Sequence, residues 1–193
     1  PLTMALTAEG NMERVEIRSG EVLWPNVVRL DAEGWAANVT DSVHRSGSVD
    51  FALNTYDLSV VKAFLGLGRD IRLPQMSVDG NATLAGLLCE AQAALSVEGR
   101  PEAQVKARFD AATESYSADA QLTALRPRSF MPSLPVGPIT ASLSAEGSGL
   151  DFMNRDTKVS ARAELKRCVV ASIDASGVCL AASYRDRRAS LLA

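Results

Sequence analysis

The stretch YSADAQLTA, residues Tyr116–Ala124, alternates strictly between apolar or small side chains and hydrophilic ones. Successive side chains of a β-strand point to opposite faces of its sheet, so this spacing gives one apolar face and one hydrophilic face. Sheets with one solvated face are typically antiparallel, whereas parallel sheets are covered on both sides. The stretch therefore predicts an antiparallel sheet that is wet on one face.

The same alternation recurs in four other parts of the chain. These are Val49–Leu53, Val105–Ala111, Ile139–Ala145 and Val159–Leu165. They predict an all-β fold with one or two short helices and a mostly antiparallel, meandering sheet.

Short polar stretches marked by glycine or proline separate the predicted strands. RSGS at Arg45–Ser48 is such a break, while EGRPE at Glu98–Glu102 and ASGV at Ala175–Val178 predict hairpin connections. The longest irregular stretch, RPRSFMPSLPVGP at residues 126–138, contains four prolines, which exclude a regular central strand or helix. It predicts a crossover or a loop across the sheet.

One segment has helical spacing. In YDLSVVKAFLG, Tyr56–Gly66, the apolar residues Leu58, Val61 and Leu65 lie at i, i+3 and i+7. A helix of at most about two and a half turns is marginal alone, so it is expected to dock on the apolar face of the sheet. RSFM at Arg128–Met131 predicts a second, single-turn helix.

A pentapeptide of the form LSAEG, Leu143–Gly147, recurs along the chain at spacings near one or two units of about 24 residues, which is enough for two strands and two turns. Its acid–glycine pair predicts strand ends, because glycine accepts a positive φ at turns and bulges. The chain is expected to be one repeat-built β domain over residues 1–193, with loose sub-units 1–69, 70–138 and 139–193. The other copies are LTAEG at Leu6–Gly10, LDAEG at Leu30–Gly34, MSVDG at Met76–Gly80 and LSVEG at Leu95–Gly99.

The composition is that of an ordinary globular chain, with 47% hydrophobic residues, 5% aromatic residues and a net charge of −3. Nucleic-acid binding is not expected, since it requires a basic face with stacking aromatic residues. The one basic cluster is Arg185, Arg187 and Arg188, interrupted by Asp186. It is interpreted as a solvated strand edge, with a headgroup or partner contact as the alternative.

Catalytic chemistry is not expected. His44 is the only histidine and lies beside a predicted turn, so it is interpreted as a surface residue, although an enzyme would have to use it. No His and Cys cluster predicts a metal, and no glycine motif predicts a nucleotide cofactor. Cys89, Cys168 and Cys179 are interpreted as small buried hydrophobes, with Cys168–Cys179 pairing across a hairpin as the alternative. We therefore predict no catalytic residue, metal or cofactor.

Two segments resemble the periplasmic AsmA-like superfamily, and within it the TamB proteins of Gram-negative bacteria. They are DIRLPQMSVDGNATLAG at Asp70–Gly86 and the region Tyr116–Phe152, which has the order strand, short plug helix, strand and glycine-rich turn. The resemblance extends over most of the chain as a general pattern of strand pairs, and it includes no catalytic motif. Pro1 at the start, in place of methionine, favours an internal segment of a longer protein.

The resemblance implies a periplasmic segment of a parent protein anchored in the inner membrane. Such proteins form a long, curved, half-pipe-like sheet with an apolar concave groove. They are implicated in phospholipid passage to the outer membrane and in outer-membrane protein assembly. The expected partners are phospholipid acyl chains and, through the parent chain, an outer-membrane barrel protein. The unpaired edges of such a segment could also associate with a second copy.

The alternation itself leaves two structures open for the apolar face. It can line an open groove that holds acyl chains through non-directional burial, or it can form the closed, dry core of a structural or adhesive β-repeat. The resemblance favours the groove. The candidate groove-lining residues are Val49, Phe51, Leu53, Val105, Ala107, Phe109, Tyr116, Ala118, Ala120, Leu122, Ile139, Ala141, Leu143, Val159, Ala161, Ala163 and Leu165.

Overall fold

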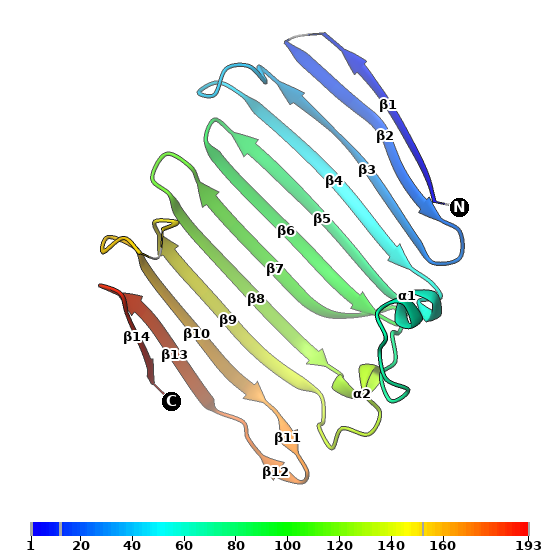
Figure 1. Cartoon of the computed structure of the whole chain (residues 1–193), viewed down its shortest axis with the longest axis vertical. Helices are drawn as coiled ribbons and strands as arrows, with labels where there is room; N and C mark the ends of the chain where they lie inside the picture. Colours follow the sequence, from blue (N-terminus) through cyan, green and yellow to red (C-terminus); the bar gives the residue numbers. More distant parts are fainter. Residues whose placement is uncertain (1, 12, 152, 193) are drawn as a thin grey trace.

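A computed structural model describes residues 2–11, 13–151 and 153–192, and it contains one large open sheet (Figure 1). Twelve strands follow one another in chain order across this sheet, and each pairs antiparallel with its neighbours. The first and last strands lie at opposite edges, so the sheet is not closed into a barrel. The predicted all-β antiparallel meander is confirmed.

The strands of this sheet are β1 (Thr3–Gly10), β2 (Arg14–Trp24), β3 (Val28–Ala37), β4 (Ser46–Thr55), β5 (Met76–Ala85), β6 (Leu88–Val97), β7 (Arg100–Asp110), β8 (Ser115–Leu125), β9 (Ile139–Ser148), β10 (Lys158–Arg167), β13 (Val178–Arg185) and β14 (Arg188–Leu192). Three smaller insertions interrupt the meander. They are helix α1 (Ser59–Phe64) after β4, helix α2 (Pro127–Phe130) after β8, and the hairpin of β11 (Val169–Val170) and β12 (Ile173–Asp174) after β10.

The strand register separates the side chains into two faces, because directly paired residues of an antiparallel sheet point to the same side. One row of paired residues crosses eleven strands, β1 to β10 and β13, and consists of apolar residues and glycine. Its members are Leu6, Gly20, Ala32, Phe51, Gly80, Ala93, Val105, Ala120, Leu143, Ala163 and Leu180. We call the side that carries this row the apolar face. The adjacent row, on the opposite side, includes Asp50, Asn81, Gln92, Lys106, Asp119, Ser144 and Arg162.

The sheet is a single layer over most of its area. Among the described residues, extensive packing between elements occurs only between neighbouring strands. Both helices lie together at one end of the strands, where the Arg72 amide donates a 2.7 Å hydrogen bond to the Phe130 carbonyl (Figure 1). The few buried hydrophobic residues are at this same end, in strand termini and connections: Val27, Leu58, Val97, Ala103, Ala141 and Cys168.

The predicted helices exist, but their expected docking on the apolar face is wrong. Helix α1 buries Leu58 at its start, whereas Val60 and Leu65 are exposed and Phe64 is 89% exposed. The helix closes one end of the sheet instead of covering its middle. The physical reason is the length of α1, because a helix of six residues has too little apolar area to cover the middle of the sheet.

The connections follow the predictions only in part. Glu98 and Gly99 form the predicted hairpin turn between β6 and β7, with φ values of 51° and 75°. The break at RSGS is misplaced, because β4 already begins at Ser46. ASGV is not a hairpin turn. It leads back into the sheet after the β11–β12 hairpin, and the Gly177 amide donates to the Leu165 carbonyl at 2.7 Å.

The proline-rich residues 126–138 form neither a crossover nor a loop across the sheet. They join β8 to β9, which are direct antiparallel neighbours, so the connection stays at one end of the strands. A backbone bridge of Val136 with Val170 ties it to the β11–β12 hairpin. The prolines instead shape a compact connection that contains α2.

The acid–glycine pairs do not always mark strand ends, so that interpretation is wrong for two of the five copies. Gly34 and Gly80 lie inside strands, whereas Gly147 is the last residue but one of β9, and all three lie on the apolar face. A Cβ at Gly80 would collide with the Phe51 ring, and one at Gly147 would lie 2.5 Å from the Tyr116 ring. These glycines therefore leave room for an aromatic side chain from the next strand, while the preceding acid points to the hydrophilic face.

One buried carboxylate joins the sheet to α2. Glu102 is the extra residue of a β-bulge in β7, and its side chain is 2% exposed. Its Oε2 accepts a 3.1 Å hydrogen bond from the backbone amide of Arg126, directly before α2. Its Oε1 lies 4.0 Å from Nε of Arg100, which is an ion pair without a hydrogen bond.

Replacing Glu102 by alanine is expected to lower the free energy of unfolding by about 1–2 kcal/mol, because the Arg126 amide loses the acceptor of a partly buried hydrogen bond. Urea unfolding monitored by circular dichroism measures the change. Glu98→Ala is the matched control, since Glu98 is an exposed partner of the same Arg100 and such pairs contribute less than about 1 kcal/mol. Equal losses for the two variants would show that the buried link to α2 does not contribute.

Candidate functional site

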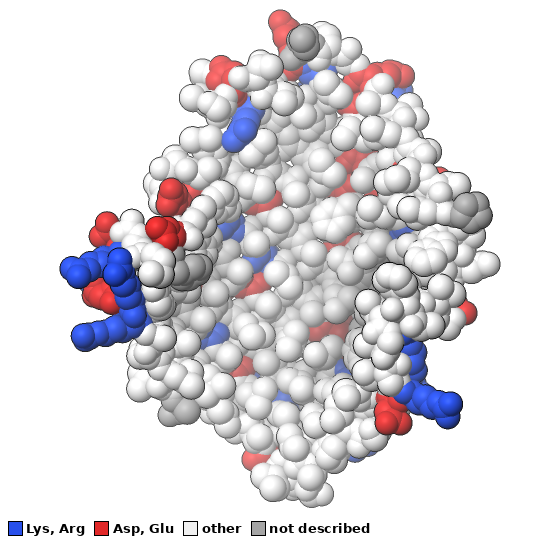
Figure 2. Space-filling view, in the orientation of Figure 1, with Lys and Arg blue, Asp and Glu red and all other residues white. Residues whose placement is uncertain are grey.

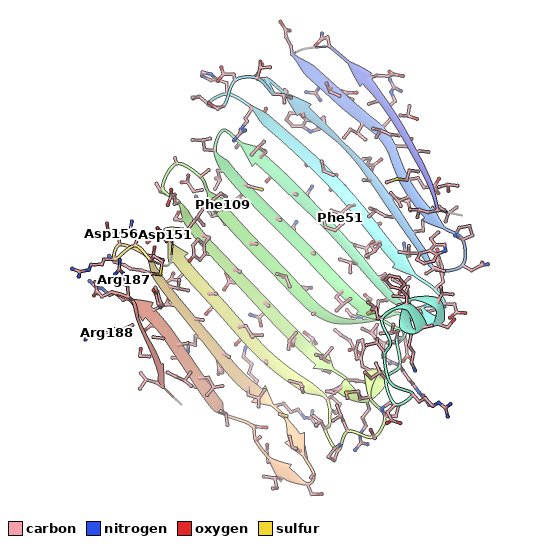
Figure 3. The ribbon with its side chains drawn as sticks, in the orientation of Figure 1. Phe51, Phe109, Asp151, Asp156, Arg187 and Arg188 are labelled. Carbon is pink, nitrogen blue, oxygen red and sulfur yellow. The ribbon has the colours of Figure 1, made fainter. Side chains whose placement is uncertain are left out.

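The candidate site is the apolar face. All of the predicted groove-lining residues except Ile139 belong to paired rows on this face. Ile139 lies past a register shift at the start of β9, opposite Leu125. Phe51 and Phe109 come from β4 and β7, well apart across the sheet (Figure 3).

Sequence reasoning missed the part of this face that comes from the remaining strands. The register places on it Met4, Leu6, Val22, Leu30, Val78, Leu84, Ala91, Leu95, Leu180 and Leu191. The alternating signal is present in Met76–Ala85, but Gly80 interrupts its apolar set. In β2, a register shift between Ile17 and Gly20 breaks the period of two.

The apolar face is broad and shallow. With strands about 4.8 Å apart, twelve strands span roughly 55 Å, and four apolar positions per strand cover roughly 25 Å along the strand. Alanine occupies much of its middle, and larger side chains there are accessible, with Val105 and Leu143 exposed by 42% and 41%. A hollow of about 260 Å³ lies along Val105, Ala120 and Leu143 and continues to Leu180.

The space-filling view looks onto this face (Figure 2). Its middle is mostly uncharged, and charged side chains show there as small blue and red patches between uncharged atoms. Charged side chains gather instead at the margins. An accessible apolar surface of this size is unusual for a soluble domain and is typical of a surface that contacts a ligand or partner.

The opposite face carries charged side chains that form exposed ion pairs. Arg29 forms ion pairs with Asp31 at 2.8 Å and Glu21 at 3.4 Å, and Arg18 pairs with Glu9 at 2.7 Å. The hydrogen bond to Asp31 is the main cause that raises the pKa of Arg29 above its usual value. The two faces therefore differ in kind, and only the apolar one lacks a solvent-compatible surface.

His44 lies at the surface, as expected. Its side chain is 73% exposed, and Nδ1 lies 2.8 Å from Oδ2 of Asp41. That hydrogen bond, together with the backbone amides of Val43 and His44, lowers the pKa of Asp41. The imidazole ring of His44 forms a hydrogen bond with a carboxylate. Among the described residues, it has no hydrogen bond with a serine or threonine hydroxyl or a cysteine thiol.

The three cysteines are unpaired. The alternative of a Cys168–Cys179 disulfide is wrong, because Cys168 is buried at the end of β10 while Cys179 pairs with Glu164 on the hydrophilic face. The interpretation of all three as buried is also wrong: Cys89 is exposed on the apolar face, opposite Leu84 and Phe109, and Cys179 is exposed on the other face.

Two absences within the described residues concern metal binding and membrane spanning. No group of three or more His, Cys, Asp or Glu side chains there is arranged to hold a metal ion. No helix in the same part of the chain has the length and apolar character needed to cross a membrane.

Comparison with known proteins does not place this architecture in a group. No family model, curated protein or solved structure matches the chain.

Proposed function

We propose that the chain is a non-enzymatic segment of a periplasmic envelope protein whose apolar sheet face contacts phospholipid acyl chains. The observation that carries this proposal is the row of apolar residues and glycine across eleven strands, on a face that no second layer of described residues covers. The resemblance to TamB-like proteins supports the same function, including a parent protein anchored in the inner membrane.

The chemistry of the face suits acyl chains better than a specific small molecule. Burial of apolar surface contributes about 25 cal/mol per Å² without directional contacts, or about 0.8 kcal/mol for each methylene group. The alanine positions, such as Ala120 and Ala163, leave a smooth surface between larger residues such as Val105 and Leu143. A surface of this kind can hold chains of different lengths and lets them move along it.

The same surface is also compatible with a role in outer-membrane protein assembly, in which apolar strand faces of a barrel protein would lie on it. The structural or adhesive alternative requires the face to be closed against another layer. Within the described residues, no element supplies that layer. A partner or the apolar face of a second copy would have to do so.

Lipid extraction tests the proposal. The purified chain is incubated with fluorescently labelled phospholipid vesicles, separated by size, and analysed for bound phospholipid by fluorescence and mass spectrometry. We expect phospholipid to travel with the folded chain. A folded chain that takes up no phospholipid, and that forms dimers through the apolar face, would favour the structural alternative.

A further inference from the structure

A row of three cations crosses β10, β13 and β14 at the strand ends opposite the helices. Lys158 pairs directly with Arg185, and Arg185 pairs directly with Arg188, so all three side chains point to the hydrophilic face. We call these three residues the cationic row. Like charges directly opposite each other on a sheet are unfavourable.

The cationic row differs from four arginines of the hydrophilic face that have ion pairs. Elsewhere, the arginines Arg14, Arg18, Arg29 and Arg108 each lie next to a carboxylate of their own or a neighbouring strand. Within the described part of the chain, the structure records no ion pair for Lys158 or Arg188. Arg185 reaches only Asp186, at 3.7 Å, in a pair that is about 70% exposed on both sides.

Hydroxyl groups lie directly behind the cationic row. The next row on the same face holds Ser160, Ser183 and Ser190, in β10, β13 and β14. A hollow of about 640 Å³ brings Lys158 and Arg185 together with Arg108 from β7 and with serines of β8 and β9. The hollow also contains one carboxylate, Glu146, which accepts a 3.2 Å hydrogen bond from the Ser160 hydroxyl. Several cations with adjacent hydroxyl donors suit a phosphate group.

The turn beside this row places two further charges there at a conformational cost. Asp186 and Arg187 form the β13–β14 turn with φ values of 52° and 60°, where asparagine and glycine are favoured. Nε of Arg187 donates a 2.7 Å hydrogen bond to the Met153 carbonyl. Arg187 and Arg188 lie at this margin, with Asp151 and Asp156 close by (Figure 3), and blue side chains project from it (Figure 2).

The hollow lies at the strand ends, next to residues of the apolar face. Tyr116, Val159 and Tyr184 border it, and all three belong to the apolar face. Val159 and Tyr184 are direct partners, one residue away from Lys158 and Arg185. Because the cations lie at the strand ends, an amphipathic ligand can extend around these ends, with its anionic group at the cations and its apolar part on the apolar face.

We infer that the cationic row and its hollow bind the phosphate of an anionic phospholipid headgroup. This inference rests on the proposed function for its choice of a lipid as the source of the phosphate. It assigns the headgroup to one end of the strands and the acyl chains to the apolar face.

The test compares two triple variants of the full chain with the same change in net charge. The first is Lys158→Gln, Arg185→Gln and Arg188→Gln. The control is Arg69→Gln, Arg72→Gln and Lys166→Gln, all exposed residues near the helix-bearing end. Binding to vesicles of phosphatidylglycerol and phosphatidylcholine is measured by sedimentation, and circular dichroism melting confirms that both variants fold.

We expect the first variant to bind the anionic vesicles roughly a hundredfold more weakly than the unmodified chain, at about fivefold per cation, and the control to change less than about threefold. Equal weakening in the two variants, or equal binding to vesicles of phosphatidylcholine alone, would overturn the inference. If the chain binds inorganic phosphate but shows no preference for anionic vesicles, the assignment of the phosphate to a phospholipid headgroup is wrong.

Labelled acyl-chain uptake separates this inference from the proposed function. If the first variant still takes up acyl chains but loses anionic vesicles, both the inference and the proposed function are supported. If the unmodified chain binds anionic vesicles through the cationic row but takes up no acyl chain, the proposed function fails while the anionic site stands.

Discussion

Replacing Leu143 by aspartate is expected to reduce phospholipid binding at least about tenfold, because a carboxylate on the apolar face would have to be desolvated under an acyl chain. Leu143 lies near the centre of the apolar face, between Ala120 and Ala163 on the neighbouring strands, and borders the apolar hollow. Its side chain is already 41% exposed, so the substitution should have little effect on folding. Fluorescent phospholipid titration measures the affinity.

Ser144→Asp is the matched control. Ser144 is the next residue in β9 but points to the hydrophilic face, where its strand neighbours are Asp119 and Arg162. A new carboxylate there lies beside both a cation and an anion, so the affinity for phospholipid should stay within about twofold. Equal losses for the two variants would mean that phospholipid does not bind on the apolar face.

Gly34→Ala is expected to lower the free energy of unfolding by about 3 kcal/mol, near the upper end for overpacking of a closely packed site. Gly34 lies in β3, directly opposite Val49 of β4. A Cβ there would collide with the backbone carbonyl of Ser48 and would lie 2.8 Å from Cα of Val49. Both obstacles are backbone atoms, so a rotamer change cannot relieve the contact and the strands must separate. Urea unfolding measures the loss.

The control is Gly20→Ala, also on the apolar face. A Cβ at Gly20 would have its nearest contact at 3.5 Å, with the Ala32 carbonyl, which is an ordinary van der Waals distance. Removal of a strand glycine should then stabilise the chain by about 0.5 kcal/mol or leave it unchanged. A similar loss at the two positions would show that the strand spacing around Gly34 is not the cause.

Local sequence periodicity was sufficient for the class of fold and for the part of the candidate site that lies on β4 and on β7 to β10. The two faces of a strand such as Tyr116–Ala124 can be predicted from its own sequence, because side-chain direction alternates along a single strand. The meander follows from the same pattern, since short connections favour neighbouring antiparallel strands. The candidate residues of β4, β7, β8, β9 and β10 therefore share one face, with Ile139 at its end.

The errors concern features that depend on a neighbour distant in the sequence. Gly80 has the local sequence of a turn, yet it lies inside β5 and its role is set by Phe51 on the neighbouring strand. Likewise, the position of α1 depends on where the strand ends meet, which its own helical spacing does not contain. The bulge at Glu102 and the cationic row could not be predicted from the local sequence either, since each depends on the cross-strand register.

Two native cysteines allow the most direct test of the apolar face. Cys89 is exposed on that face and Cys179 is exposed on the hydrophilic one, so a Cys168→Ala variant carries one reporter on each side. The measurement is the rate of alkylation of each thiol by a water-soluble maleimide, with and without phospholipid. We expect phospholipid to slow the reaction of Cys89 at least about tenfold, through burial under acyl chains, and to change that of Cys179 less than about twofold. Unchanged reactivity at Cys89 with phospholipid bound, or equal protection of both thiols, would contradict acyl-chain binding on the apolar face.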